Sequence, residues 1–321
     1  MDEGRLPIPH DERHYWGSVR ELPLERWQPA LSELARRHGF RNDGWQRAVL
    51  GRNVVVTNGE VAVKLGPPMW HGEMAREALA LAAIAGKLPL TTPSVVAAGR
   101  IDGWDYLIQT RIAGETLWSH WEMLPTQDRN MLAEQHGALM AALHALPATT
   151  MPAEVLFPWR DMLQAQRQTC RTTLQSAGVS PDLVAQAEGY LDAVLPLLLA
   201  DDEVRVLHGD LSLFNLMIAP GSGTWRITGL VDWGDVKLGP RMHDWISPCV
   251  HMYKGDSAAL EAWYRGYAMS AAERTPLRQH CAMARVILYY AEDMRHLLET
   301  VRGASECRTW PDVARCFWHL A

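Results

Sequence analysis

The chain has 321 residues, of which 48% are hydrophobic and 21% are charged, and its formal net charge at pH 7 is −6. This is ordinary for a soluble globular protein, and the length suits one large two-lobed domain or two smaller ones. The acidic balance argues against non-specific nucleic-acid binding. No uninterrupted apolar run comes near the roughly 20 residues that a membrane-spanning helix needs, because LDAVLPLLLA is broken by Pro196.

Cysteine and histidine spacing argues against a disulfide framework and against a zinc site. The 5 cysteines are far apart, odd in number and form no C-x-x-C pair, and the 13 histidines show no H-E-x-x-H spacing. The N-terminal stretch MDEGRLPIPHDERHYW has acidic residues and no apolar core, unlike a secretory signal. We therefore expect a cytoplasmic protein, a monomer or a homodimer, with neither a membrane nor a nucleic acid as partner.

The first part of the chain alternates between strand and helix patterns. Residues 24–39 have the apolar period of an amphipathic helix. In residues 54–65, two β-branched runs are joined by Asn-Gly, the strongest short signal for a β-hairpin. A helix rich in alanine and leucine is predicted over 73–86, followed by two strands over 92–101 and 103–112. These elements predict a small antiparallel sheet with a packed helix.

The rest of the chain is mainly helical. Residues 128–147 place leucines on one helix face, and another helix is predicted from Pro181 onward. Strand-like runs return only between residues 204 and 233. The predicted fold class is therefore α+β, with a sheet lobe over residues 1–111 and a helical lobe over residues 112–321.

A lysine and a glutamate in the sheet lobe form the first candidate functional pair. Lys64 lies in the predicted strand V-A-V-K, and Glu77 lies on the helix that follows. Taken alone, the lysine reads as a protective charge at a strand edge and the glutamate as a solvated helix charge. Paired, they would hold an ammonium group against nucleotide phosphates, as in kinases. Glu73, one helical turn earlier, is the rival partner.

Two motifs in the helical lobe supply the second half of the site. H-G-D-L-S-L-F-N fits the kinase catalytic-loop spacing H-R-D-L-x-x-x-N, with Asp210 to accept the acceptor proton and Asn215 to hold magnesium. L-V-D-W-G places Asp232 where kinases have the D-F-G aspartate, a second Mg²⁺ ligand. Each motif alone would recur by chance in turns. Their order along the chain, with matching element types, predicts a phosphotransfer site.

These motifs also carry a family resemblance. H-G-D-L-S-L-F-N with G-L-V-D-W-G-D-V-K-L-G-P-R-M-H-D-W resembles the aminoglycoside phosphotransferase family, which includes choline kinase-like enzymes. The segment V-H-M-Y-K-G-D-S-A-A-L-E-A-W-Y-R-G-Y is similar to its hygromycin phosphotransferase branch. The resemblance covers residues 45 to 270 and is most specific over 206–245. It implies a two-lobed protein-kinase-like fold and transfer of the γ-phosphoryl group of ATP or GTP, with Mg²⁺, to an aminoglycoside hydroxyl, which confers resistance.

The resemblance assigns further roles. Lys64 would bind the α- and β-phosphates, backbone amides near Gly51 would help hold the triphosphate, and Thr110 and Ile112 would offer adenine a carbonyl and an amide. Asp244 in the H-D-W triplet is expected to be a structural acceptor that braces the catalytic loop. His208 is likewise expected to have a structural role and not to act as a base.

The chain departs from the family pattern at Ser212, which replaces the second histidine of H-G-D-L-H-x-x-N. Two further absences argue against a protein kinase. The sheet lobe has no G-x-G-x-x-G loop, which the resembled family also lacks, and too few residues follow Asp235 to form an activation loop with A-P-E. Peptide acceptors are therefore disfavoured, and a small hydroxylated acceptor is expected.

The identity of the acceptor is the least constrained expectation. A cationic aminoglycoside would need carboxylates, and the candidates are Asp235, Glu292 and Asp293, although Arg295 could pair with Glu292. Kinases of a macrolide, choline, a sugar or an amino alcohol remain alternatives. So does a nucleotide-binding pseudokinase, although all four motif residues of an active site are present.

Overall fold

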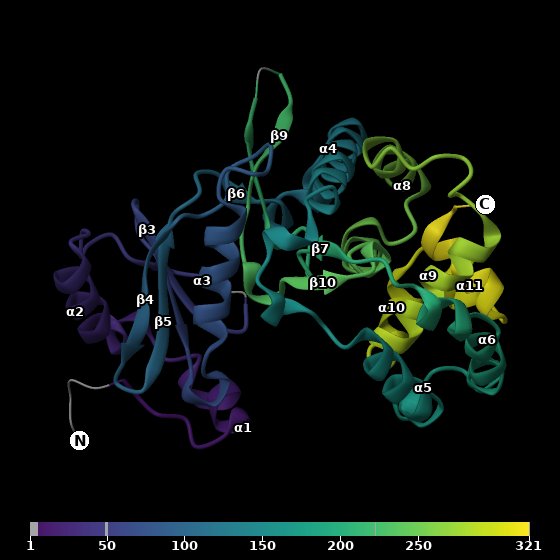
Figure 1. Cartoon of the computed structure of the whole chain (residues 1–321), viewed down its shortest axis with the longest axis horizontal. Coiled ribbons are helices and arrows are strands. Elements are labelled where there is room, and N and C mark those ends of the chain that lie inside the picture. The colour runs from purple at the N-terminus through teal and green to yellow at the C-terminus, as the bar shows by residue number, and fades with distance from the viewer. Residues whose placement is uncertain (1–5, 49–50, 222, 321) are drawn as a thin grey trace. The chain divides into compact units, whose positions relative to one another are not determined.

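The computed structural model describes residues 6–48, 51–221 and 223–320, which fall into two compact units (Figure 1). The first unit is Met1–Ala113 with Gly229–Asp235, and the second is Gly114–Thr228 with Val236–Ala321. The predicted α+β class, an antiparallel sheet followed by a mainly helical part, is confirmed. The single division expected after residue 111 differs from these units, because Gly229–Asp235 returns to the first one. There the Leu230 N–H donates to the carbonyl of Thr91 at 3.2 Å.

The first unit is built on a five-stranded antiparallel sheet in the order β1-β2-β3-β5-β4. The predicted hairpin forms its centre, and the Asn58 side chain stabilises the turn by accepting the N–H groups of Glu60 and Val61, each at 2.8 Å. The strands are β1 (Gln46–Arg47), β2 (Val54–Thr57), β3 (Val61–Gly66), β4 (Val95–Ile101) and β5 (Trp104–Thr110).

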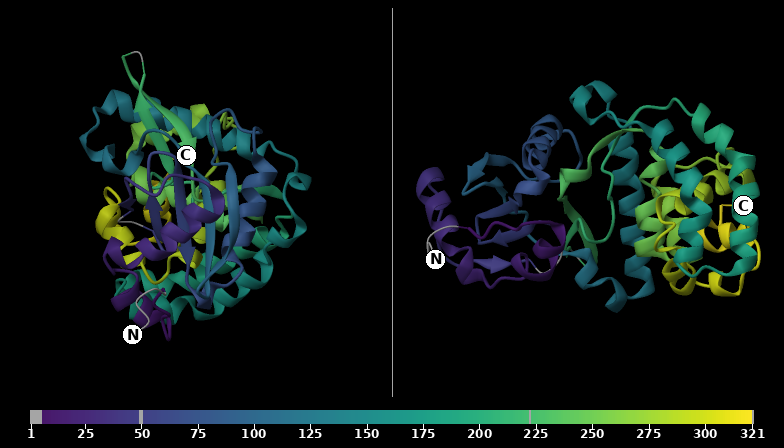
Figure 2. Two further views of the ribbon diagram at one scale, coloured as in Figure 1. Left: turned by 90° about the vertical axis from the view of Figure 1, so that its left-hand side faces the viewer. Right: turned by 90° about the horizontal axis from the view of Figure 1, so that it is seen from below.

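Helices cover both faces of this sheet (Figures 1 and 2). Their bounds are α1 (Glu12–His14), a π-helical turn (Tyr15–Val19) and α2 (Gln28–His38) for one face, and α3 (Glu73–Ile84) for the other. Because side chains alternate along a strand, Val61, Val63 and Leu65 enter the core cluster shared with α2. The intervening residues of β3, including Lys64, therefore face α3.

The second unit combines helices with two small sheets. One is the antiparallel pair of β7 (Arg205–Leu207) and β10 (Lys237–Gly239), and the loop that carries Asp210 follows β7. The other sheet has the order β6-β8-β9, with β6 (Glu115–Thr116), β8 (Leu216–Pro220) and β9 (Trp225–Leu230). The helices are α4 (Thr126–His144), α5 (Trp159–Ser176), α6 (Pro181–Ala200), α7 (Ile246–Pro248), α8 (Ser257–Gly266), α9 (Pro276–Tyr289), α10 (Met294–Thr300) and α11 (Trp310–Trp318).

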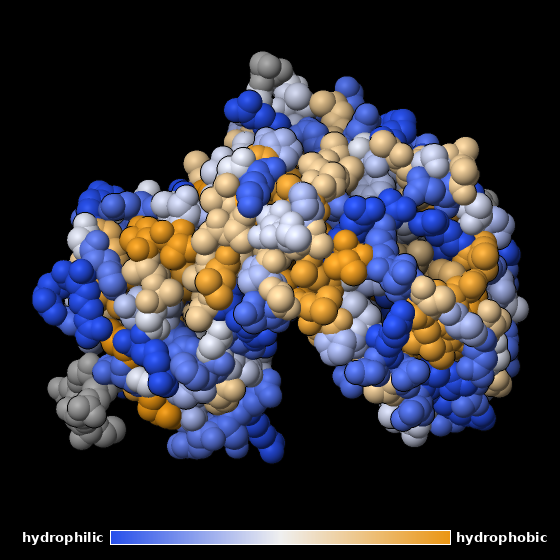
Figure 3. Space-filling view, in the orientation of Figure 1, coloured by the Kyte–Doolittle hydropathy of each residue, from blue (hydrophilic) through white to orange (hydrophobic). Residues whose placement is uncertain are grey.

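Helix α6 corrects the expectation about apolar runs. The helix continues through Pro196, so that by length and composition Pro181–Ala200 could cross a membrane. A core helix of a soluble protein passes the same test. Here its polar face is ion-paired with α5, since Arg167 contacts Asp192 at 2.8 Å and Arg171 contacts Glu188 at 2.9 Å. On the face drawn in Figure 3, hydrophilic residues are interspersed with smaller hydrophobic groups, as is usual for globular surfaces.

Helices α4 and α8 cross at two glycines. A Cβ atom on Gly137 would lie 2.2 Å from the carbonyl oxygen of Trp263, and one on Gly266 would lie 1.9 Å from that of Glu134. Neither carbonyl can move without its helix, because both belong to helical backbone. The close approach of these helices therefore requires glycine at both positions.

We expect Gly137→Ala to lower the free energy of unfolding by about 3 kcal/mol, because overpacking must separate the two helices. Thermal and urea unfolding would measure the loss. Gly189→Ala in the exposed part of α6 is the matched control, since a Cβ there meets nothing within 4 Å. That substitution should stabilise by about 0.5–1 kcal/mol through helix propensity alone. Equal effects of the two substitutions would contradict the packing argument.

Candidate active site

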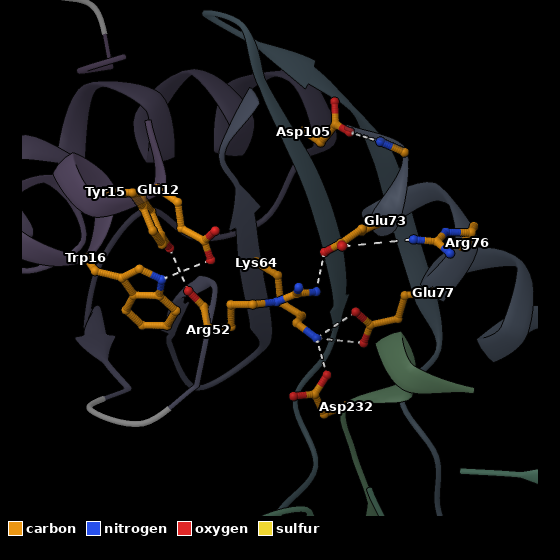
Figure 4. Close-up of polar contacts among 11 residues, drawn as sticks. Glu12, Tyr15, Trp16, Arg52, Lys64, Glu73, Arg76, Glu77, Asp105 and Asp232 are labelled. Carbon is orange, nitrogen blue, oxygen red and sulfur yellow. Dashed lines mark hydrogen bonds and ion pairs between the residues drawn. The ribbon is translucent and has the colours of Figure 1, made fainter. Parts of the chain in front are cut away.

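In the first unit, Lys64 and Glu77 form a buried ion pair (Figure 4). The alternation of β3 turns Lys64 toward α3, where its Nζ lies 2.8 Å from Oε1 and 2.6 Å from Oε2 of Glu77. The Lys64 and Glu77 side chains are 5% and 0% exposed. A buried charge is stable only when paired, so each residue depends on the other.

Asp232 joins this pair from the segment that follows β9. Its Oδ1 lies 2.7 Å from the Nζ of Lys64, and its side chain is 48% exposed. The next residue, Trp233, is fully buried, and its backbone N–H donates to Oε1 of Glu77 at 3.2 Å. Asp232 has φ +62°, a left-handed conformation that is uncommon outside glycine. Strained backbone of this kind tends to persist at functional sites.

The electrostatics of the cluster keep Lys64 charged. Burial alone would favour the neutral amine, but the carboxylates of Asp232 and Glu77 outweigh it and raise the pKa of Lys64. The result is a fixed ammonium group beside a half-exposed carboxylate, an arrangement suited to a polyanionic ligand.

The two glutamates on α3 have different partners. Glu77 pairs with Lys64, whereas Glu73 accepts a hydrogen bond from the guanidinium of Arg52 and lies 4.0 Å from Arg76. Of the two alternatives left open by the sequence, the partner of Lys64 in this structure is therefore Glu77.

The remaining candidates for the donor site lie just before β2 and at or just after the end of β5. Gly51 has φ +105°, and its carbonyl accepts from the Arg20 guanidinium at 2.6 and 3.0 Å. Thr110 ends β5, and its N–H donates to the carbonyl of Ser94. The Ile112 side chain is buried, and a Cβ on Gly229 would lie 2.5 Å from its Cγ2.

In the second unit, Asp210 lies in the loop between β7 and β8 and is held from two sides. Its Oδ1 accepts from the Ser247 hydroxyl at 2.6 Å. The amide nitrogen of Asn215 donates to its Oδ2 at 2.9 Å and to its carbonyl at 2.8 Å. The side-chain amide of Asn215 thus has its nitrogen turned to Asp210, which leaves the oxygen for another partner.

A second aspartate braces this loop, as expected. Asp244 accepts the backbone N–H of His208 at 2.9 Å and that of Gly209 at 2.8 Å, and it contacts Nε2 of His144 at 3.1 Å. Burial opposes its ionisation, but the hydrogen bonds and His144 outweigh this and lower the pKa of Asp244. The ionised carboxylate of Asp244 accepts two backbone N–H groups and so fixes the main chain just before Asp210.

A pocket of about 220 Å³ opens beside this loop, entirely within the second unit. Phe214, from the same loop, stacks on Trp118 with 6.0 Å between ring centroids. The lysine and glutamate side chains that line the pocket are Lys254 and Glu122. The wall also includes Trp121, His251 and His296.

Two residues that the sequence analysis did not select connect the pocket to Asp210. The hydroxyl of Tyr290 lies 3.3 Å from Nε2 of His251 in the pocket wall, and it also lies close to the Ser247 side chain. Burial raises the pKa of Tyr290, so its hydroxyl stays protonated, and burial lowers that of His251. Ser247 lies two residues after the H-D-W triplet ends, but no known motif includes a serine or a tyrosine at these positions, so the sequence could not identify them.

The carboxylates expected around a cationic acceptor do not line this pocket. Asp235 belongs to the first unit, and Glu292 and Asp293 are exposed in the turn between α9 and α10. Arg295, a possible partner of Glu292, instead contacts Glu299 at 3.0 Å. The side chains of Trp159, Trp245 and Trp263 are buried and belong to the core of the second unit.

Within the described residues, no group of three or more His, Cys, Asp and Glu side chains could hold a metal ion. The expected magnesium ligands are of another kind, one carboxylate from Asp232 and one amide oxygen from Asn215. Oxygen ligands few in number suit Mg²⁺, which keeps much of its water and also binds substrate phosphates. The chemistry of this donor set therefore fits the ion.

Comparison with known proteins gives the family of the chain. The model of the phosphotransferase enzyme family APH matches residues 35–280. The chain therefore belongs to this phosphotransferase family.

Solved structures share the fold at low identity. ADP-bound aminoglycoside phosphotransferase APH(2'')-Ib is 16% identical, with 90% of this chain and 99% of that chain covered and a TM-score of 0.58. The GDP and kanamycin complex of an APH(2'') enzyme is 19% identical, with 82% and 92% covered and a TM-score of 0.61. Macrolide 2'-phosphotransferase MphH from Brachybacterium faecium is 21% identical, with 90% and 97% covered and a TM-score of 0.56. None of these three is a hygromycin enzyme.

Proposed function

We propose that this chain is a small-molecule kinase that transfers the γ-phosphoryl group of ATP or GTP to an acceptor hydroxyl. The observation that carries the proposal is the state of Asp210, whose two carboxylate oxygens are oriented by Ser247 and Asn215 beside a pocket. An aspartate that only formed a turn would not need hydrogen bonds to both of its carboxylate oxygens. Membership of the phosphotransferase family supplies the reaction class.

In the proposed donor site, Lys64 binds the α- and β-phosphates and Glu77 orients its ammonium group. Backbone groups at Gly51 help hold the triphosphate, and Thr110 and Ile112 offer adenine a carbonyl and an amide. Asp232 and Asn215 are the proposed ligands of Mg²⁺, which would neutralise charge on the β- and γ-phosphates. Structural relatives bound to ADP and to GDP support a nucleotide donor without deciding between adenine and guanine.

The proposed chemistry is an in-line displacement. A bond forms between the acceptor oxygen and the γ-phosphorus while the bond from that phosphorus to the β–γ bridging oxygen breaks, leaving the nucleoside diphosphate. The hydroxyl proton passes to a carboxylate oxygen of Asp210. Because the transition state is loose, the main work of the protein is to position the reactants and balance charge.

The first candidate acceptor is a cationic aminoglycoside such as hygromycin, whose phosphorylation in the cytoplasm would confer resistance. Glu292 and Asp293 support it, because two exposed carboxylates follow Tyr290, which contacts the Ser247–Asp210 pair. Asp235, beside Asp232, is a third candidate contact. The kanamycin complex of a structural relative is in keeping with this choice.

The second candidate is an acceptor with few charges, such as a macrolide or another sugar-bearing molecule. The pocket wall favours it, because three aromatic rings, Trp118, Trp121 and Phe214, accompany a single lysine and a single glutamate. Aromatic faces stack well on sugar rings, whereas several ammonium groups would each need an anionic partner once desolvated.

An acceptor panel distinguishes the candidates. The purified chain would be incubated with Mg²⁺, ATP or GTP, and hygromycin, kanamycin, a macrolide, choline or a simple sugar. The expected result is a mass gain of one phosphoryl group on one class of acceptor, matched by nucleotide consumption. Thermal stabilisation by nucleotide with no phosphorylated acceptor would contradict the kinase and favour a pseudokinase.

A further inference from the structure

A second cation–glutamate pair lies one helical turn from Lys64 and Glu77. Glu73 and Glu77 are four residues apart on α3, so their side chains project from the same side of the helix. Glu77 takes Lys64 from β3, and Glu73 takes the guanidinium of Arg52, which precedes β2 (Figure 4). Lys64 in β3 and Arg52 just before β2 thus each pair with one of two glutamates that are one turn apart on α3.

The two pairs differ in exposure. The Arg52 side chain is 46% exposed and that of Glu73 is 18% exposed, whereas Lys64 and Glu77 are almost fully buried. An ion pair open to water contributes little net free energy, so its cation is readily transferred to a stronger anion. A buried pair cannot be exchanged in this way. Arg52 is therefore the cation of the two that is free to change partner.

The backbone beneath Arg52 is anchored, although its side chain can move. The Tyr15 hydroxyl donates to the carbonyl of Arg52 at 2.6 Å, and the Arg20 guanidinium donates to the carbonyl of Gly51. Burial raises the pKa of Tyr15 to about 12, so this hydroxyl keeps its proton. The guanidinium itself stacks on Trp70, with 4.6 Å from its carbon to the ring centroid.

We propose that Arg52 is a further phosphate-binding residue of the donor site. When the nucleotide binds, the Arg52 guanidinium moves from Glu73 to the β- and γ-phosphates. The inference rests on the proposed function, because it assigns Arg52 to the same donor as Lys64. A planar guanidinium makes paired hydrogen bonds to phosphate oxygens, which complements the single point charge of Lys64. Glu73 holds the Arg52 guanidinium until the nucleotide binds.

The test compares the binding of ATP, ADP and AMP by calorimetry, with Mg²⁺, to Arg52→Ala and Glu73→Gln. Arg52→Ala should weaken ATP and ADP about tenfold or more and leave AMP within about twofold, as expected for lost charge-assisted hydrogen bonds to the outer phosphates. Glu73→Gln should keep or tighten ATP binding, because the competing carboxylate is gone. Arg76→Ala, which removes a neighbouring positive charge, is the matched control and should change nothing.

The outcomes separate this role from a structural one. If Arg52 only tied its loop to α3, Arg52→Ala and Glu73→Gln would weaken all three nucleotides alike, and this would overturn the inference. Wild-type affinity for ATP in Arg52→Ala would overturn it as well. If Lys64→Met still loses ATP in that case, the proposed function stands without Arg52. A wild-type chain that binds no nucleotide would overturn both.

Discussion

Asp210→Asn is expected to lower turnover about a thousandfold, because a neutral amide cannot accept the proton of the acceptor hydroxyl. Nucleotide affinity should change less than about twofold, since the proposed donor contacts come from other residues. The amide retains one oxygen for Ser247 or Asn215, so the loop should keep its shape. Steady-state kinetics on the best acceptor and calorimetry with ATP measure the two effects separately.

The control for this prediction is Asp202→Asn, which removes an exposed carboxylate from the same unit. It should match the wild type in turnover. Thermal unfolding of both variants checks that neither effect arises from misfolding. An Asp210→Asn enzyme with more than a tenth of wild-type turnover would rule out the role of general base.

The fold was predictable where signals are local. The Asn-Gly turn, the alanine-rich helix and the apolar runs around H-G-D and D-W-G each specify their own element, and the structure contains them over 54–66, 73–84, 205–220 and 225–230. Local signals also misled once: Pro196 reads as a helix break, yet α6 continues through it. Helix packing in the second unit outweighs the one hydrogen bond that proline removes.

The site was harder to predict, because its contacts join distant elements. The sequence assigned Glu77 to Lys64 but kept Glu73 as a rival, and only the packing of α3 against β3 decides between them. Ser247 and Tyr290 carry no motif, because the packing of the folded chain, and no sequence spacing, brings Ser247 to Asp210 and Tyr290 to Ser247. For the acceptor, counting carboxylates selected exposed positions, whereas the pocket combines three Trp and Phe rings with one glutamate.

The second large effect is expected for Glu77→Ala. Removing this carboxylate takes away two contacts to the Lys64 ammonium and the acceptor of the Trp233 N–H. Because the loss of one partner strands a buried charge, we expect the free energy of unfolding to fall by about 3 kcal/mol, the lower end of the usual range, since Asp232 remains. Urea unfolding followed by circular dichroism would measure it. Glu73→Gln, one turn away and more exposed, should change stability by less than about 1 kcal/mol.

A double substitution then separates stability from chemistry. Lys64→Met with Glu77→Leu replaces a buried ion pair by apolar side chains, a change that is often neutral or stabilising. The half-exposed carboxylate of Asp232 can turn to water, so stability should recover relative to Glu77→Ala. Turnover should stay lost, because no ammonium group remains for the phosphates. If stability and turnover both recover, the ion pair serves only the fold. If stability alone recovers, the buried charge serves the nucleotide. That result would explain why a costly ion pair occupies a position that two apolar side chains would fill.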